Sequence, residues 1–176
     1  WTVNAITLKI RFLGSAREVG RAAIYVKSEK AQVLLDYGVM LDHVPGFPMH
    51  ILPRDVDAII LTHSHLDHSG AIPIFFIRDR KTVYGTKLTF EFTNLLIKDF
   101  IHLSSYYLPF EIIELRSMMR SCVNLNYREK HTIGDAEIHL LNSGHMPGSA
   151  HALLEADGKR LLYTSDYNLV QTRLLS

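Results

Sequence analysis

A stretch of six residues, His63-Ser64-His65-Leu66-Asp67-His68, constrains this chain more than any other feature. It holds four side chains that can ligate a metal, and it follows directly on the apolar run Ala58–Thr62, which is typical of a buried strand. A strand that ends in a tight turn can aim several side chains into one pocket. Imidazole suits zinc, and a carboxylate beside it can hold a second cation. Four such groups are costly to bury together without an ion, so the stretch predicts a metal site.

Composition limits the class of protein. The 176 residues can enclose one domain with a substantial core, and 47% hydrophobic with 21% charged residues is typical of globular proteins. The net charge of +1 gives no argument for nucleic-acid binding. The single cysteine, Cys122, excludes an internal disulfide and a cysteine-rich zinc site, and it favours a reducing, cytoplasmic compartment. No apolar run is long enough to cross a bilayer and no signal peptide is visible, so we expect no membrane association.

The order of the predicted elements indicates an α/β layered fold. Helices are predicted over 69–79, over 87–103 with Thr86 as the N-cap, and from Pro109 onwards. Asp157-Gly158 is a strong hairpin signal. The predicted strands are 6–12, 22–26, 32–35, 58–62, 82–85, 136–141, 150–156 and 160–164. The apolar positions that we expect to face the core are Leu88, Phe92, Leu95, Leu96, Phe100 and Leu103 in the second helix, and Ile112, Leu115, Met119 and Cys122 in the third.

Three further polar residues occupy strand ends. Asp36 and Asp166 each follow an apolar strand, and His145 lies in a Gly- and Pro-bounded loop after another. Strand ends are where α/β folds place reactive groups, so these residues are candidates for the same site as the histidine motif. For Asp36, a role as a turn former before Gly38 is an equally good interpretation.

The pattern His63-x-His65-x-Asp67-His68, with the later His145 and Asp166, resembles the metallo-β-lactamase superfamily. Within that superfamily the chain is most similar to the β-CASP nucleases, which include archaeal and eukaryotic cleavage-and-polyadenylation endonuclease subunits. The segments that carry this resemblance are Gly14–Arg21, Leu34–Gly38, Ser143–Ala150 and Leu162–Tyr167. The resemblance implies an αββα sandwich, with two mixed sheets between layers of helices and a dinuclear metal centre at one edge.

The resemblance also implies two zinc ions, whose ligands would be His63, His65, Asp67, His68, His145 and Asp166. The three histidines 63, 65 and 145 would hold the first ion, and Asp166 would bridge both. Asp36 would orient a ligand or the metal-bound water from behind. The candidate catalytic residues are therefore Asp36, Asp67 and Asp166. The histidines that match no ligand position are His43, His50, His102, His131, His139 and His151.

As an activity, the resemblance implies endonucleolytic hydrolysis of single-stranded RNA, in some members also from the 5′ end, by a hydroxide held on the two zinc ions. A homodimer or an RNA-processing complex would fit this role. Two alternatives stay open: a small-molecule hydrolase of the same superfamily that acts on a thioester or lactam, and a non-catalytic RNA-processing subunit. The intact set of ligands argues against the second alternative.

The chain departs from the family pattern in two ways. Ser165 stands where the family usually has glycine. In addition, the family inserts a β-CASP domain soon after the segment around Asp166, and it returns with further histidines that this sequence lacks after His151. We therefore expect residues 1–176 to be the N-terminal segment of a metallo-β-lactamase domain. Such a segment would bind zinc at the first position, bind it more weakly at the second, and cleave little RNA by itself.

Overall fold

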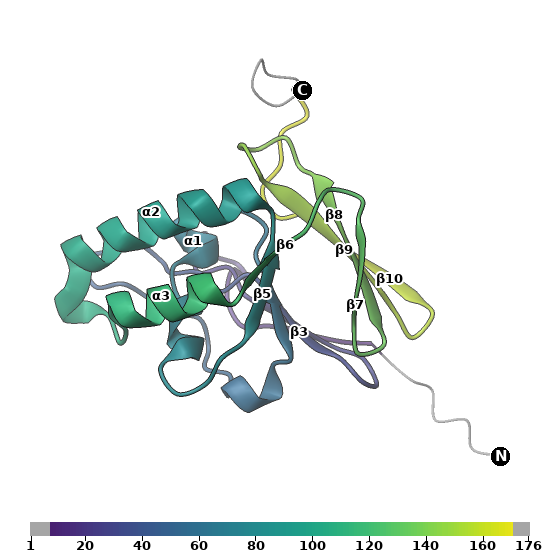
Figure 1. Cartoon of the computed structure of the whole chain (residues 1–176), viewed down its shortest axis with the longest axis horizontal. Coiled ribbons are helices and arrows are strands. Elements are labelled where there is room, and N and C mark those ends of the chain that lie inside the picture. The colour runs from purple at the N-terminus through teal and green to yellow at the C-terminus, as the bar shows by residue number, and fades with distance from the viewer. Residues whose placement is uncertain (1–7, 171–176) are drawn as a thin grey trace.

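Two β-sheets pack face to face, and helices cover the outer face of the first sheet (Figure 1). This computed structural model describes residues 8–170. The first sheet has the order β1-β2-β3-β4-β5-β6 and comprises Lys9–Phe12, Ile24–Lys27, Gln32–Leu35, Ala58–Ile60, Thr82–Gly85 and Cys122–Asn124. Strands β1 to β3 pair antiparallel, and β3 to β6 pair parallel. The second sheet is antiparallel in the order β10-β9-β8-β7, with β7 Lys130–Ile133, β8 Ala136–Asn142, β9 Ala150–Ala156 and β10 Lys159–Tyr163.

The helices lie together on one side of the molecule. They are α1 Leu66–Ser69, α2 Lys87–Ser104 and α3 Ile112–Arg120, with the short 3-10 turns η1 Pro53–Asp55, η2 Ile72–Phe76 and η3 Ser105–Tyr107. Within residues 8–170 the layers are therefore helix, sheet and sheet, and the predicted α/β class is confirmed. No helix of this described part is long and apolar enough to span a membrane.

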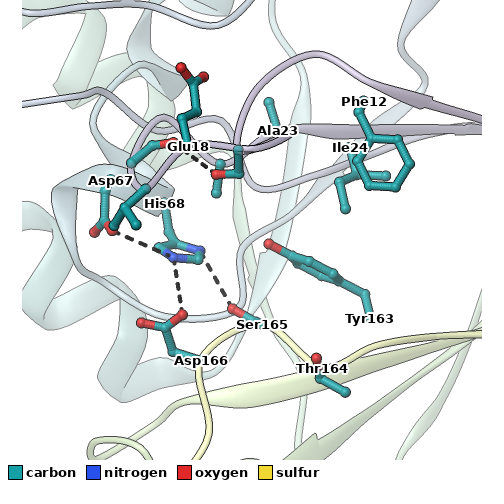
Figure 2. Close-up of a pocket in the computed structure, with 14 residues that line it drawn as sticks. Phe12, Glu18, Ala23, Ile24, Asp67, His68, Tyr163, Thr164, Ser165 and Asp166 are labelled. Carbon is teal, nitrogen blue, oxygen red and sulfur yellow. Dashed lines mark hydrogen bonds and ion pairs between the residues drawn. The ribbon is translucent and has the colours of Figure 1, made fainter.

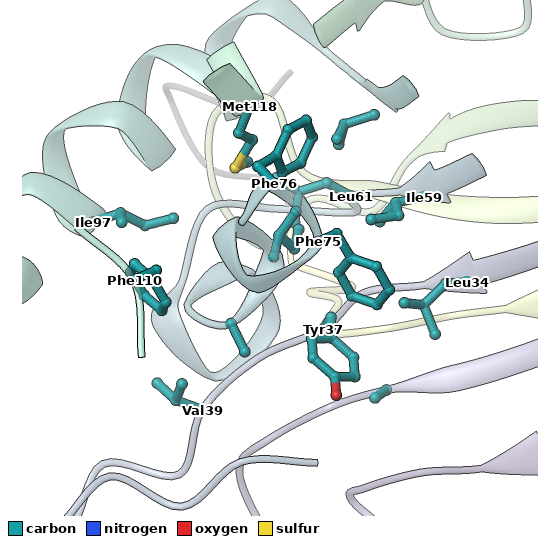
Figure 3. Packing of buried hydrophobic residues seen from close by; sticks show 14 of the residues in the cluster. Leu34, Tyr37, Val39, Ile59, Leu61, Phe75, Phe76, Ile97, Phe110 and Met118 are labelled. Atoms are coloured by element: carbon teal, nitrogen blue, oxygen red, sulfur yellow. The ribbon is translucent and has the colours of Figure 1, made fainter. Parts of the chain in front are cut away.

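Two hydrophobic cores fix the layers. One lies between the helices and the first sheet, where Leu34, Ile59, Phe75 and Ile97 are buried together (Figure 3). The other lies between the two sheets. Strand β4 contributes to both, because Ile59 faces the helices while Ile60 faces the second sheet. A central parallel strand that is covered on both faces reads as a continuous apolar run, which is the pattern that the sequence shows before the histidine motif.

The long helix α2 begins where the sequence predicts, but it buries a different face. Thr86 caps it, since its hydroxyl accepts a hydrogen bond from the backbone N–H of Thr89. The helix buries Phe90, Thr93, Ile97 and Phe100 among others. Of the expected inward positions, Phe100 is buried and Leu96 is half-buried, whereas the exposed ones are Leu88, Phe92, Leu95 and Leu103. The helix carries apolar residues on two sides, so its periodicity alone selected the wrong one.

The predicted helix over 69–79 is wrong. The histidine motif itself forms the helical turn α1, with His65 as the N-cap and Gly70 as the C-cap, and a separate 3-10 turn follows over Ile72–Phe76. A helix that starts three residues earlier ends before Pro73, which then opens the 3-10 turn.

Other differences concern short elements. Strands β6 and β7 were not expected, because β6 has three residues and β7 reads Lys-His-Thr-Ile. Cys122 therefore lies in a strand, although its thiol is still packed against the helix-side core. In α3 the buried residues are Leu115 and Met118. The remaining expected strands are present with bounds that differ by at most two described residues, and Ile6 and Thr7 lie outside the described residues.

Candidate metal centre

The predicted site residues converge at one edge of the two-sheet sandwich. Strands β3 and β4 are parallel, so the segments after them, which carry Asp36 and the histidine motif, leave the first sheet side by side. Strands β8 and β10 both pair antiparallel with β9, so the loops with His145 and Asp166 also leave the second sheet at one edge. The backbone N–H of Ala150 donates to the carbonyl of Thr62 at 2.9 Å and joins the two edges. Residues up to 130 positions apart are thereby brought into one cluster.

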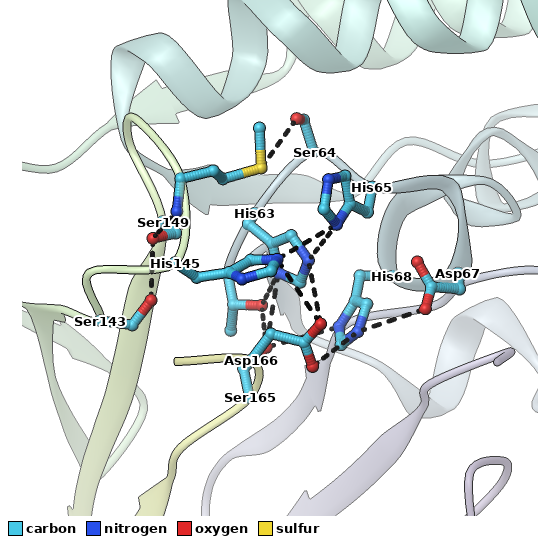
Figure 4. A network of polar contacts seen from close by, with 12 residues as sticks. His63, Ser64, His65, Asp67, His68, Ser143, His145, Ser149, Ser165 and Asp166 are labelled. Atoms are coloured by element: carbon cyan, nitrogen blue, oxygen red, sulfur yellow. Dashed lines mark hydrogen bonds and ion pairs between the residues drawn. The ribbon is translucent and has the colours of Figure 1, made fainter. Parts of the chain in front are cut away.

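Three imidazoles and one carboxylate form the centre of this cluster (Figure 4). Nε2 of His63 lies 3.2 Å from Nδ1 of His65, and that atom lies 3.3 Å from Nε2 of His145. Oδ2 of Asp166 lies 3.9 Å from Nε2 of His63 and 3.6 Å from Nε2 of His145. Ligands at about 2.0–2.1 Å from a tetrahedral zinc ion are separated from one another by about 3.3 Å. These four donor atoms therefore fit around one ion of that size.

The second oxygen of Asp166 faces a different pair of side chains. Oδ1 of Asp166 lies 3.6 Å from Nε2 of His68, and Oδ2 of Asp67 lies 3.8 Å from the same nitrogen. One carboxylate thus stands between two groups of donors, with one oxygen toward each group. This is the kind of arrangement that a carboxylate bridging two cations would require.

Asp36 forms the base of the cluster. Its side chain is fully buried, and its carboxylate accepts from the N–H and the hydroxyl of Thr62 at 2.8 and 2.7 Å. It also accepts from Nδ1 of His68 at 2.8 Å and from the hydroxyl of Tyr163 at 3.0 Å. Asp36 adopts a φ of 56°, which aspartate tolerates better than most residues. It is therefore a support for His68 as well as a turn former, and the two interpretations of this residue are compatible.

Backbone contacts hold the histidine motif against the segment after β3. The N–H of Tyr37 donates to the carbonyl of His68 at 2.8 Å, and the N–H of Ala22 donates to the carbonyl of Asp67 at 2.7 Å. Gly38 passes so close that a Cβ there would lie 1.7 Å from the Asp67 carbonyl oxygen. Only glycine permits this approach, which sets the position of Asp67 and His68.

Burial and neighbouring charge keep the imidazoles of His63 and His65 neutral. Burial, and then the positive charge that the neighbouring histidines would carry, lowers the pKa of His63 to about 2. Burial and His145 also lower the pKa of His65. Burial acts in the same direction on His68, but the hydrogen bond to Asp36 and the charges of Asp36 and Asp67 outweigh it and raise the His68 pKa. Neutral imidazole is the form that ligates a metal, so His63 and His65 are prepared for that role.

The cluster is buried on the side of Asp36 and exposed to solvent on the side of Asp166. His63, His68 and Asp36 are buried, whereas the side chain of Asp166 is 47% exposed. A cavity of about 360 Å³ lies beside Asp67 and His68. It is bordered by the loop around Glu18, between β1 and β2, and by the end of β10 (Figure 2). The donors are therefore accessible from solvent through one side.

Sequence reasoning missed the polar residues beneath the ligands. Hydrogen bonds around Asp36 involve Thr62, Tyr163 and Ser165. The only feature of the sequence that could have indicated these residues is that each lies within three positions of a proposed ligand. Among the described residues, the other histidines are not part of the donor cluster. His139 pairs with Glu137, and Nδ1 of His151 lies 2.6 Å from the carbonyl oxygen of Thr164, two residues before Asp166.

Residues 16–173 match the sequence profile of the metallo-β-lactamase superfamily, so the chain belongs to this superfamily. It is 36% identical over 99% of its length to RNase aCSPSF2 of Saccharolobus solfataricus, and 37% identical over 95% to Probable RNase MJ4 of Methanocaldococcus jannaschii. It is also 35% identical over 95% to the transcription termination factor FttA of Methanothermobacter thermautotrophicus. These relatives confirm the resemblance to the β-CASP branch. The chain spans 36%, 40% and 28% of their respective lengths.

Solved structures agree on the fold. A protein of unknown function from Enterococcus faecalis V583 superposes with a TM-score of 0.67 at 20% identity, covering 92% of this chain and 44% of that one. A metallo-β-lactamase variant from Cronobacter sakazakii gives 0.61 at 19% identity, covering 94% and 64%. At these identities the likeness establishes the architecture alone.

Proposed function

We propose that this chain carries the dinuclear zinc centre of a β-CASP-type ribonuclease that hydrolyses phosphodiester bonds in single-stranded RNA. The observation that carries the proposal is the position of Asp166, whose two oxygens face the His63–His65–His145 group and the Asp67–His68 group. The names of two relatives, RNase aCSPSF2 and Probable RNase MJ4, support RNA as the substrate. We also propose a cytoplasmic location.

Bound zinc would supply a Lewis acid and an activated water for attack on the phosphorus. The side chains of this chain prepare the site for that chemistry. Asp36 holds His68 through Nδ1, which leaves Nε2 directed at Asp166. Asp67 and Asp166 present negative charge at the open side, and this charge would repel a phosphodiester in the absence of cations. RNA binding at this site should therefore depend on metal.

The other expectations derived from the family stay predictions. These include the insertion of a β-CASP domain into a longer metallo-β-lactamase domain, weaker binding of the second ion, and assembly into a homodimer or an RNA-processing complex. A non-catalytic RNA-processing subunit stays the second alternative, and one relative is named a transcription termination factor.

The proposal is tested by incubating 5′-labelled single-stranded RNA with the zinc-loaded protein at its full encoded length. We expect products to depend on zinc and to disappear in His65→Ala and Asp166→Asn, while His139→Ala retains activity. The same preparations are offered a chromogenic lactam and a thioester. Turnover of either small molecule without RNA cleavage would favour the alternative hydrolase, and zinc-independent RNA cleavage would contradict the proposal.

A further inference from the structure

The residues immediately before two of the proposed ligands touch each other across the sheets. Thr62 precedes His63 at the end of β4, and Ser165 precedes Asp166 after β10. Their hydroxyl oxygens lie 2.7 Å apart, which is the usual length of an O–H···O hydrogen bond. This is a side-chain contact between the turn that carries the histidine motif and the turn that carries Asp166.

The direction of this hydrogen bond follows from its neighbours. An ionised carboxylate only accepts, so the hydroxyl proton of Thr62 is committed to Asp36 at 2.7 Å. Oγ1 of Thr62 has lone pairs left but no second proton. Ser165 must therefore donate to Thr62, and the lone pairs of Ser165 are left to face the rings above it.

Those rings are the imidazoles of His63 and His68, one from each group of donors. Nδ1 of His63 lies 3.3 Å from Oγ1 of Thr62 and 3.5 Å from Oγ of Ser165, while Nδ1 of His68 lies 3.4 Å from Oγ of Ser165. Both hydroxyl oxygens can only accept from His63, so its proton belongs on Nδ1. Its Nε2, which faces Asp166, then carries the free lone pair that a metal needs.

We propose that Ser165 is a positioning residue of the metal centre, whose hydroxyl anchors the Asp166 turn to Thr62 and helps to hold His63 in the Nδ1–H tautomer. This inference rests on the proposed function and adds one residue to it. Glycine at this position could not form such a bond. Supporting hydrogen bonds of this kind typically change metal affinity by roughly 10- to 100-fold.

The backbone conformation of Ser165 permits substitutions that remove its hydroxyl. Ser165 has a φ of 52°, a conformation that glycine adopts without strain. Ser165→Gly therefore removes the hydroxyl without introducing backbone strain, and Ser165→Ala removes it while keeping the Cβ. Arg128→Gly is the matched control, since Arg128 is exposed, has a φ of 65° and lies in the turn before β7.

Zinc affinity is measured by competition with a chromophoric chelator, and the His63 tautomer by long-range ¹H–¹⁵N NMR of the zinc-free protein. We expect roughly tenfold weaker binding in both Ser165 variants, a loss of the single Nδ1–H tautomer, and no change in Arg128→Gly. Wild-type affinity in Ser165→Gly, or weaker binding with an unchanged His63 tautomer, would overturn the role of the hydroxyl. If the wild type itself binds no zinc, the proposed function fails instead.

Discussion

Nδ1 of His68 lies 2.8 Å from Oδ2 of Asp36, and both side chains are buried at the base of the cluster. The carboxylate is shared with Thr62 and Tyr163, so one residue orders groups from β4, α1 and β10. Burial and the charge of Asp36 raise the pKa of Tyr163 well above its usual range, which keeps the phenol as a donor. Asp36 is thus a structural support for the residues around it.

Asp36→Asn should destabilise the zinc-free protein by about 2–3 kcal/mol, because a charged acceptor of several buried hydrogen bonds is replaced by a neutral amide. The free energy of unfolding in urea measures this. Asp79→Asn is the control, since Asp79 is an exposed carboxylate paired with Lys81, and its replacement should cost less than about 0.5 kcal/mol. Equal effects of the two substitutions would mean that Asp36 is not a structural anchor.

Gly38→Ala should displace the histidine motif. The added Cβ would lie within 2.0 Å of two backbone atoms of Asp67, so the chain must move, at a cost of about 3 kcal/mol or more. Gly46→Ala is a matched substitution whose Cβ meets only side-chain atoms, of Met40 at 3.4 Å and of Arg21 at 3.9 Å, in ordinary contact. Urea unfolding and zinc affinity should both fall in the first variant only. A fully stable Gly38→Ala protein would show that this close approach does not exist.

Thr86 connects the start of α2 to the loop that carries His145. Its hydroxyl caps the helix at Thr89 and donates to the carbonyl of Gly148 at 2.7 Å. Loss of the cap and of this bond in Thr86→Ala should lower the free energy of unfolding by about 2 kcal/mol. Thr132→Ala, at an exposed position of β7, should change it by less than about 0.5 kcal/mol. Similar values for the two variants would contradict this contact.

Cys122 should react slowly in the folded protein. Burial raises the pKa of its thiol from the ordinary value of 9.0 to about 12, so the reactive thiolate is scarce at pH 8. Iodoacetamide labelling followed by mass spectrometry should be much slower in buffer than in urea. In the folded protein the rate should still be rising above pH 10, because the deprotonation midpoint lies higher. A plateau near pH 9 would show an exposed thiol.

The cluster itself was predictable because its ligands are dense and typical of a known family. His63, His65, His145 and Asp166 were expected together, and their donor atoms do lie together. The hydrogen bonds of Ser165 and Tyr163 were not predictable, because serine and tyrosine at strand ends have many other uses. Only the contact between the two sheets gives these side chains their partners.

The packing of α2 could not be derived for a different reason. One side of the helix carries Phe90 and Ile97, and another carries Leu88 and Leu95, so its apolar pattern admits two orientations. The neighbours that α2 packs against decide between them, and they come from distant parts of the chain. Short strands such as β6 are likewise set by pairing with β5 and leave almost no local pattern.

The central claim is that side chains from two sheets hold zinc together, and the zinc content of the purified chain tests it most directly. After zinc loading and gel filtration, elemental analysis should find about one tightly held ion per wild-type chain. His145→Ala, which removes the donor from the second sheet at a partly exposed position, should lose that ion, while His139→Ala retains it. The same zinc content in all three proteins, or none in the wild type, would contradict the account.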